Sequence, residues 1–275
     1  MTSFALAAIR LMAITVMTLA LMPVQLIVVA IAPRYYSAIP LRFHRMICKF
    51  GGLQITVKGD ISAVKPTLFI CNHSSYLDII ILSALMPTSF VAKAEIASWP
   101  LFGWLGKLQK TVFIERRRSQ AKKHVDAVTQ SLQAGRNLVV FPEGTSSDQN
   151  RVLPFKPTLF RVADTMIDGR PITVQPVCIS FVEINGLPVG RNEKPFFAWY
   201  GDMDLIPHLW EFLSLGRTHV VVEFFPAITR AQFADHKSMA QYSQRLLASS
   251  LSSAVTGKSR PVPTMPPISA QLATA

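Results

Sequence analysis

The chain is 275 residues long, with 50% hydrophobic and only 16% charged residues, which is more apolar than soluble enzymes usually are and indicates contact with lipid. Its 28 lysine and arginine residues outnumber 16 acidic residues, and the net charge of +12 suits an anionic partner: a phospholipid surface, an acidic carrier protein or a phosphorylated substrate. Zinc-ligand spacings, basic zippers and RNA-binding aromatic signatures are missing from the sequence, so we expect no nucleic-acid partner. Three isolated cysteines form neither a disulfide framework nor a CxxC site, which favours a reducing compartment and no metal site.

The N-terminal segment predicts a membrane anchor. From Leu11 to Ala32 there are 22 uncharged residues, which as a helix would measure about 33 Å, enough to cross the hydrocarbon core. A cleaved signal peptide is the competing interpretation, but the apolar run is longer than the usual signal segment. Pro23 leaves open a helical hairpin or a segment lying in one leaflet. Only Arg10 precedes the segment and four cations follow it, so the positive-inside rule places the body in the cytoplasm: Arg34, Arg42, Arg45 and Lys49.

Composition divides the chain into four parts. Residues 1–34 form the predicted membrane anchor, and residues 35–52 form a basic, aromatic connector suited to the headgroup layer. Residues 53–255 form the main domain. Residues 256–275, in which proline recurs among small and polar residues, are predicted to be a disordered tail.

Short apolar runs alternate with helical patterns through the main domain. This alternation predicts an α/β fold, a mixed sheet flanked by helices, in which ligands bind at the ends of strands. The predicted strands are 53–58, 67–70, 89–92, 111–114, 137–141, 172–181, 196–200 and 219–225, and the predicted helices are 119–133, 205–213 and 231–254.

Cys71 to Asp78 is the first polar motif at a strand end. His73 is followed five positions later by Asp78, and a carboxylate beside an imidazole fixes its tautomer and stabilises its protonated form, so that the free nitrogen can act as a base. Residues five apart on a helix point about 140° apart, so the two side chains meet only if His73 lies in the turn before the helix. The alternative interpretation is that Asn72, Ser74 and Ser75 are ordinary helix-capping residues and His73 is a turn histidine.

Two further polar motifs follow strands. Phe113-Ile114-Glu115-Arg116 supplies a cation, and Phe141-Pro142-Glu143-Gly144-Thr145 supplies a carboxylate in a tight turn. In this order, together with His73-x4-Asp78 and the later strand Gln175-Pro176-Val177, the motifs resemble those of the glycerolipid acyltransferase family typified by bacterial lysophosphatidic acid acyltransferase. The resemblance covers about residues 45–230.

The resemblance implies a lysolipid O-acyltransferase of the bacterial inner membrane. His73 and Asp78 would be catalytic, whereas Arg116, Glu143, Gly144 and Thr145 would bind the acceptor. Glu143 could instead brace the loop, Gly144 could permit the turn, and Thr145 could bond to the backbone. The acyl donor would be acyl-CoA or acyl-carrier protein, with no cofactor, and a direct transfer is expected because no Gly-x-Ser-x-Gly nucleophile motif is present. Besides the donor, the expected partners are membrane lipids.

The sequence departs from the family pattern at two positions. Lys110 replaces the glycine that usually opens the second motif. Ser146 replaces an arginine that commonly follows the third motif, so a phosphate site would lack one cation unless Arg151 or Lys156 supplies it. In this respect the sequence is similar to bacterial lyso-ornithine lipid acyltransferases of the same family. Both acceptors remain open, with the phosphate-bearing one slightly favoured because it is more frequent in the family.

Two hypotheses of other classes compete with this one. A catalytically idle membrane adaptor would hold an acyl-carrier or phospholipid partner on its basic face, and a thioesterase would release free fatty acid without an acceptor. The intact set of His73, Asp78, Arg116 and Glu143 favours the transferase.

Overall fold

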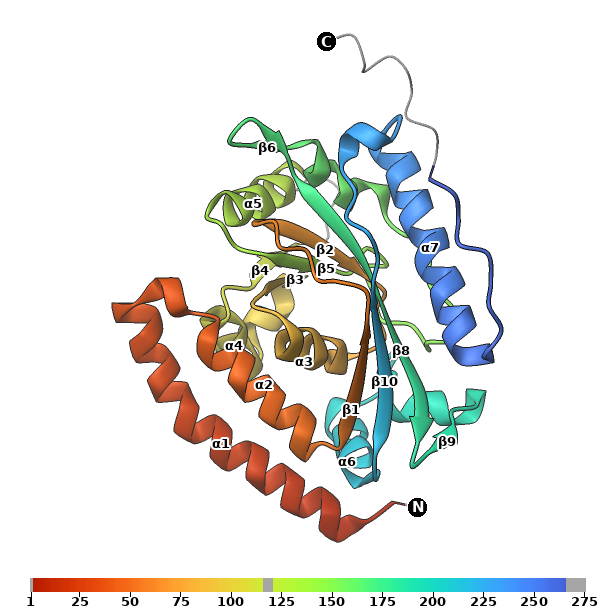
Figure 1. Cartoon of the computed structure of the whole chain (residues 1–275). Coiled ribbons are helices and arrows are strands. Elements are labelled where there is room, and N and C mark those ends of the chain that lie inside the picture. Colours follow the sequence, from red (N-terminus) through yellow and green to blue (C-terminus); the bar gives the residue numbers. More distant parts are fainter. Residues whose placement is uncertain (1, 116–120, 266–275) are drawn as a thin grey trace.

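The computed structural model describes residues 2–115 and 121–265 (Figure 1). Its centre is a sheet of eight strands, seven of which follow the spatial order β1-β10-β8-β2-β5-β3-β4, while β9 pairs with β8. From β8 to β4 the neighbouring strands are parallel; β10 runs antiparallel to β8, and β1 is parallel to β10. The predicted α/β fold with a mixed sheet is therefore confirmed. The strands are β1 Leu53–Lys58, β2 Thr67–Cys71, β3 Ser89–Lys93, β4 Val112–Ile114, β5 Leu138–Val140, β8 Thr173–Ile184, β9 Leu187–Pro188 and β10 Thr218–Phe224, and β6 Met166–Ile167 and β7 Arg170–Pro171 form a separate pair.

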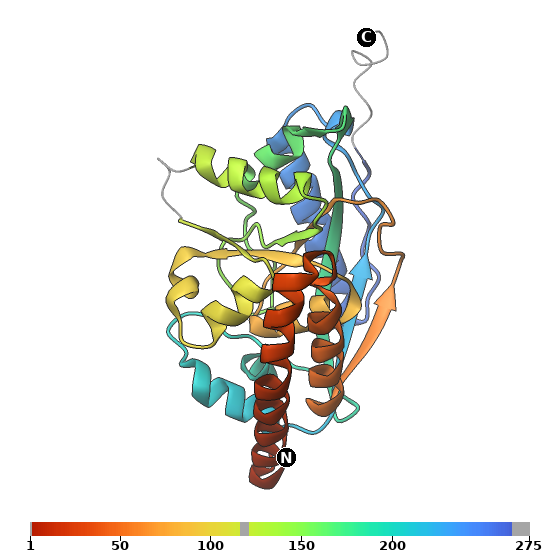
Figure 2. The same ribbon diagram turned by 90° about the vertical axis from the view of Figure 1, so that its left-hand side faces the viewer.

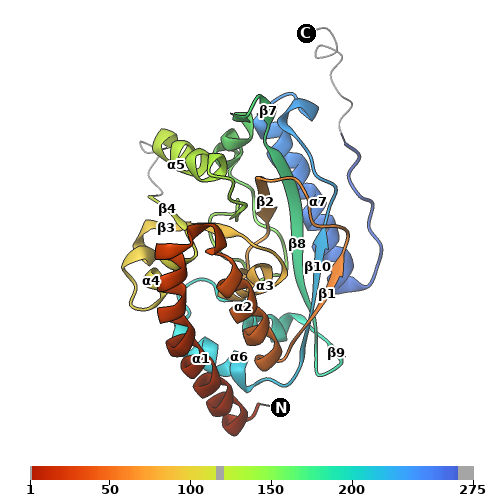
Figure 3. The same ribbon diagram turned by 60° about the vertical axis from the view of Figure 1, so that its left-hand side comes forward.

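Helices cover both faces of the sheet, and the side chains of β2 alternate between the two cores. Phe69 and Cys71 belong to the core under one face, and Leu68 and Ile70 to the core under the other. A strand buried on both sides explains why residues 67–71 are apolar almost without interruption. The helices contributing to the first core are α1 Phe4–Ile31, α2 Ala38–Phe50, α3 Tyr76–Leu85 and α6 Leu205–Ser214, and those contributing to the second are α5 Ala121–Gln133 and α7 His236–Thr256 (Figures 1 and 3).

The remaining helical segments lie between these elements. A short helix, α4 Phe102–Leu108, follows β3, and the tighter 3-10 turns are η1 Pro33–Tyr35, η2 Ala94–Ser98, η4 Pro157–Asp164, η5 Arg191–Phe196 and η6 Arg230–Gln232.

The N-terminal helix α1, Phe4–Ile31, lies along the domain against α2 and α6 (Figures 1 and 2). Its inner face carries polar side chains. Arg10 donates to the carbonyl oxygens of Leu213 and Gly216, both at 3.0 Å, and also to that of Leu215. Gln25 donates to the carbonyl oxygens of Tyr36 and Leu108, at 2.7 and 3.1 Å. The outer face is apolar and exposed: Phe4, Ile9, Met12, Val16, Leu19, Val24, Leu26, Ile27 and Ile31.

By length and composition α1 could cross a membrane, and it is the one such helix among the described residues. Three of its four buried side chains are polar, which is unusual for a helix of a soluble core, while Ala7, Leu11 and Ile14 contact the first core. Hydrogen bonds from Arg10 and Gln25 therefore fix the helix to the domain, while its apolar face points away from it.

The structure differs from the sequence predictions in three segments. The predicted strand 196–200 is wrong: Pro195 has no N–H to donate, and the chain turns here as Phe197 N–H bonds to Lys194 O. Most of the connector 35–52 is the helix α2, which packs against α3. The tail was expected to be disordered from residue 256, but Arg260 N–H and Pro261 O bond to serine side chains of α7, while residues 266–275 lie outside the described part.

Candidate active site

His73 and Asp78 meet at the carboxyl end of β2. The imidazole Nδ1 lies 2.9 Å from Asp78 Oδ2. The side chain of His73 is 21% exposed, whereas that of Asp78 is fully buried. A carboxylate only accepts hydrogen bonds, so Nδ1 carries the hydrogen and Nε2 keeps its lone pair. His73 precedes α3 and Asp78 lies in its first turn, which is the arrangement that the spacing required.

Asp78 also caps the helix on which it stands. Its Oδ2 accepts the backbone N–H groups of Ser74 at 2.6 Å and Ser75 at 3.0 Å, and its Oδ1 accepts the Ser74 hydroxyl at 2.9 Å. Ser75 is the N-cap residue and accepts the N–H of Leu77 at 3.2 Å. The two interpretations of this motif, helix capping and pairing with histidine, therefore apply to the same carboxylate at once.

The loop after β5 holds the backbone of His73 on both sides. Glu143 Oε1 accepts the His73 N–H at 2.7 Å, and Glu143 Oε2 accepts the Leu153 N–H at 2.8 Å. Ser147 donates both its N–H and its hydroxyl to the His73 carbonyl oxygen, at 2.9 and 3.1 Å. The imidazole stacks on the Phe141 ring with 4.0 Å between centroids. The first and third motifs thus form one structural unit.

Glycine is favoured at position 144 because its φ of +72° lies in the left-handed region. The site of a Cβ would lie 2.5 Å from Nζ at the end of the flexible Lys156 side chain. The Lys156 side chain therefore crosses the turn and brings its ammonium beside the third motif. The Gly144 N–H donates to Phe141 O at 3.0 Å, which closes the turn. Thr145 is exposed and Ser146 is half-buried.

The second motif ends at the same edge of the sheet. β4 runs parallel to β2 with β5 and β3 between them, so the carboxyl ends of all four strands face the same side. Arg116, the predicted acceptor-binding cation after β4, lies outside the described residues. Lys110 adopts a φ of +58°, so the lysine occupies a backbone conformation that favours the glycine usual in the family.

The described residues at this edge of the sheet provide neither a reactive cysteine nor a cluster of metal ligands. Cys71 is completely buried, and burial together with nearby Asp78 and Cys178 raises the pKa of its thiol well above the ordinary value. Within residues 2–115 and 121–265, no group of three or more His, Cys, Asp or Glu side chains could hold a metal ion.

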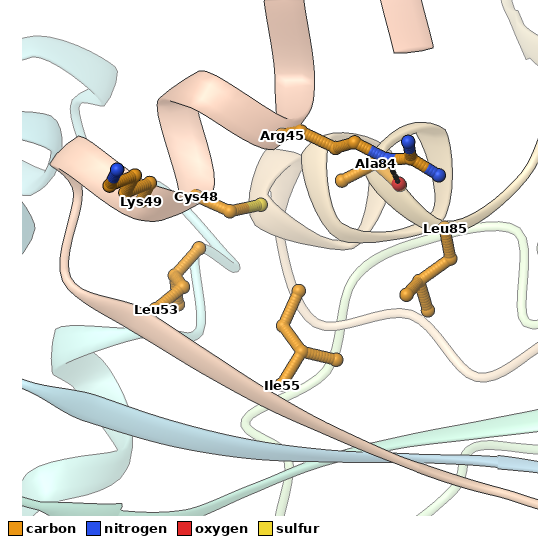
Figure 4. Close-up of a pocket in the computed structure, with 7 residues that line it drawn as sticks. All are labelled: Arg45, Cys48, Lys49, Leu53, Ile55, Ala84 and Leu85. Atoms are coloured by element: carbon orange, nitrogen blue, oxygen red, sulfur yellow. Dashed lines mark hydrogen bonds between the residues drawn. The ribbon is translucent and has the colours of Figure 1, made fainter. Parts of the chain in front are cut away.

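A separate hollow lies away from the motifs, between α2, the end of α3 and β1 (Figure 4). Arg45 reaches across it and donates to Ala84 O at 2.9 Å. None of the residues of the three motifs lines this hollow, which is bordered by Arg45, Cys48, Lys49, Leu53, Ile55, Ala84 and Leu85.

The burial of Glu143 predicts a pH-dependent stability. Desolvation raises its pKa from 4.5 to about 7, with backbone N–H groups of His73 and Leu153 opposing the rise and the Asp78 charge adding to it. The folded state therefore binds the proton of the Glu143 carboxyl group more tightly than the unfolded state does. This binding stabilises the folded state fully below pH 4.5, and the stabilisation is lost as the pH rises to about 7. Between pH 4.5 and 7.5 the wild type should therefore lose about 3 kcal/mol of unfolding free energy relative to Glu143→Gln. Urea unfolding of both proteins at pH 4.5 and 7.5 measures this difference, and parallel pH profiles would contradict it.

Three contributors to this site were not predicted from the sequence. Phe141 opens the third motif but had no predicted role of its own, although its ring stacks on His73. Ser147 was not singled out, although it donates twice to His73 O. Asn72 was interpreted as a capping residue, but its amide bonds to both N–H and C=O of Ile179 at 2.9 Å and so ties the end of β2 to β8.

Comparison with known proteins gives consistent matches. Residues 54–180 match the sequence profile of a family described as Acyltransferase. The chain is 36% identical over 253 residues to the lyso-ornithine lipid O-acyltransferase of Rhizobium meliloti (strain 1021), covering 90% of this chain and 87% of that protein. It is 35% identical over 173 residues to the 1-acyl-sn-glycerol-3-phosphate acyltransferase of Neisseria gonorrhoeae, covering 62% of this chain and 64% of that protein.

A solved structure has the same fold. The crystal structure of the 1-acyl-sn-glycerophosphate (LPA) acyltransferase PlsC from Thermotoga maritima matches with a TM-score of 0.65. The match covers 91% of this chain and 97% of that chain, at 16% sequence identity.

Proposed function

Because this chain belongs to the acyltransferase family and moves an acyl group to a lysolipid, we propose that its acceptor is a lyso-ornithine lipid. The observation that carries this choice is the extent of the similarity: the relative with that name aligns with 90% of the chain, against 62% for the relative named for 1-acyl-sn-glycerol-3-phosphate. Ser146 supports the same choice, because an ornithine headgroup brings its own cation and needs one protein cation fewer. This proposal replaces the slight preference for the phosphate-bearing acceptor.

His73 is the proposed general base. With Nδ1–H directed at Asp78, Nε2 takes the proton of the acceptor hydroxyl as its oxygen attacks the thioester carbonyl carbon. Asp78 stabilises the imidazolium that forms. As the tetrahedral intermediate collapses, the C–S bond breaks and the departing sulfur takes the proton back from Nε2. Acyltransferases of this family need no cofactor, and acyl-CoA or acyl-carrier protein enters as a substrate.

Negative charge that develops on the thioester oxygen needs hydrogen-bond donors. The Gly144 N–H already donates to Phe141 O, so we assign this role to the exposed Thr145 and its backbone N–H. Glu143 is better suited to bracing His73 than to holding the acceptor, since its carboxylate is buried and accepts two backbone N–H groups. Arg116 remains the proposed headgroup-binding cation, on the basis of its motif alone.

The protein is proposed to lie on the cytoplasmic side of the inner membrane, where both acyl donors are found. Attachment of α1 through Arg10 and Gln25 supports an orientation along one leaflet rather than across the bilayer. A cysteine introduced by Thr2→Cys should then not be labelled by an impermeant maleimide added to intact spheroplasts. Labelling from the periplasmic side would show that α1 spans the membrane.

Purified enzyme offered lyso-ornithine lipid and lysophosphatidic acid side by side tests the proposed acceptor. We expect kcat/KM to be at least about tenfold higher for the lyso-ornithine lipid, which corresponds to one charge-assisted contact. Ser146→Arg should shift this ratio toward the phosphate-bearing acceptor. Exclusive use of lysophosphatidic acid by the wild type would overturn the proposal, and an unchanged ratio in Ser146→Arg would show that Ser146 is incidental.

Lysophosphatidic acid is the second candidate acceptor because of one observation. The Lys156 ammonium lies beside Gly144 in the third motif, where it could contact an anionic headgroup in place of the arginine missing at position 146.

A further inference from the structure

Lys194 in η5 is a buried ammonium with an unusual environment. The residue is 1% exposed, although lysine is almost never fully buried unless it is paired with a charge. In the part of the chain that the structure describes, both acceptors of its Nζ are neutral: Gln149 Oε1 and Phe181 O, each at 3.3 Å. Burial lowers the pKa of Lys194 to about 8, with Asp148 opposing this effect. Burying the Lys194 ammonium costs desolvation free energy, and a specific role of this side chain would explain its burial.

The two acceptors of Lys194 place it behind the third-motif loop. Gln149 is fully buried and has a φ of +58°, a conformation that a non-glycine residue adopts only when its surroundings hold it there. Its Oε1 also accepts the Phe181 N–H at 3.4 Å. Lys194 therefore fixes the end of the loop against β8.

Hydrogen bonds connect this anchor to the proposed base. The backbone N–H of Gln149 donates to Ser147 Oγ at 3.3 Å. The Ser147 hydroxyl in turn donates to His73 O at 3.1 Å. From Lys194, the path runs through Gln149 and Ser147 to His73 without a gap.

We propose that Lys194 is a positioning residue for the acyl-transfer reaction, which holds Gln149 and Ser147 so that Ser147 fixes the backbone of His73. The assignment rests on the proposed role of His73 as the base. Lys194 does not contact the substrate; it acts by keeping Nε2 of His73 where the acceptor hydroxyl must arrive. Misplacement of a reacting group by about 1 Å is enough to cost about a hundredfold in rate.

The test is the steady-state kinetics of Lys194→Met, which keeps an unbranched side chain but removes the ammonium. We expect kcat to fall about tenfold to a hundredfold while the acceptor KM stays within about twofold, since the loss affects the transition state and not lipid binding. A folded variant with wild-type kcat, or with a changed KM alone, would overturn the assignment. Absence of transfer by the wild type would instead refute the proposed function.

Gln109→Met is the matched control. Gln109 is also buried and donates to two neutral oxygens, Ser83 Oγ at 2.8 Å and Thr88 O at 3.3 Å, but these lie before β3, at the opposite edge of the sheet from His73. This variant also removes a buried polar group and should keep its kcat, whatever its change in thermal stability. An equal loss of kcat in both variants would mean that Lys194 acts only through general stability.

Two further variants keep the proposal falsifiable if Lys194→Met does not fold. Gln149→Asn tolerates the positive φ but is too short to reach Lys194, and it should reproduce the fall in kcat. Combining it with Ser147→Ala tests the path itself: the double variant should be no slower than the slower single variant. Losses that multiply would show that Gln149 and Ser147 act independently and would contradict the path.

Discussion

Replacing His73 with alanine is expected to lower kcat for acyl transfer by about 10³-fold to 10⁴-fold. The reason is the geometry of the imidazole: Nδ1 is bonded to Asp78 at 2.9 Å and the ring stacks on Phe141, so a single orientation of Nε2 is available to take the proton. Unfolding by urea should be affected little, because the side chain is partly exposed and, among the described residues, forms a side-chain hydrogen bond to Asp78. Steady-state transfer from acyl-CoA to purified lysolipid measures the change.

The same assay separates the competing functions. A membrane adaptor would show acyl transfer that is equally absent, or equally present, in the wild type and His73→Ala. A thioesterase would release free fatty acid at the same rate whether or not lysolipid is supplied. Transfer that requires both the lysolipid and His73 is the result expected of the acyltransferase.

Replacing Asp78 with alanine is expected to reduce both kcat and stability. The buried carboxylate accepts from His73 Nδ1 and from three donors of Ser74 and Ser75, all of which would lose their acceptor. Unsatisfied buried donors cost about 1 to 3 kcal/mol each, so the free energy of unfolding should fall by at least about 3 kcal/mol. The imidazole also loses the group that sets its tautomer, which should lower kcat about 10²-fold to 10⁴-fold.

Two variants separate the two roles of Asp78. Asp78→Asn keeps an acceptor oxygen for the helix and should recover part of the stability without recovering kcat. Asp235→Ala removes the corresponding capping carboxylate of α7, which accepts the Ser238 N–H at 2.6 Å and lies on another helix. It should lower the unfolding free energy by less than Asp78→Ala does and leave kcat intact. Full activity in Asp78→Asn would contradict the role of the carboxylate in catalysis.

Local patterns were sufficient to predict most of the sheet and the pair His73–Asp78. Strands such as 67–71 are marked by uninterrupted apolar runs, and the spacing of the pair decided that one residue must precede the helix. The segment 196–200 was misassigned because its aromatic residues have strand propensity, whereas the fold turns the chain at Pro195. Tertiary context overrides propensity at such positions.

Contacts between residues far apart in sequence could not be predicted. Glu143 binds the backbone of a residue 70 positions earlier, and Lys194 reaches Gln149 across 45 positions. Neither pair has a local sequence pattern. A backbone N–H group is present in almost every residue, so the partner of Glu143 cannot be identified from the sequence. The sequence around Lys194 does not show that this lysine is buried. For Glu143 the sequence left acceptor binding and bracing of the loop open, and its observed bonds to the N–H groups of His73 and Leu153 correspond to bracing.

The attachment of α1 has a mechanical consequence for the enzyme. Arg10 and Gln25 are 15 residues apart, so the helix is fastened at two points separated by about 22 Å. If α1 lies in a membrane as proposed, it cannot tilt independently of the domain, and the depth of His73, the proposed base, follows from the position of this helix. The hydroxyl of the lysolipid must then reach that depth.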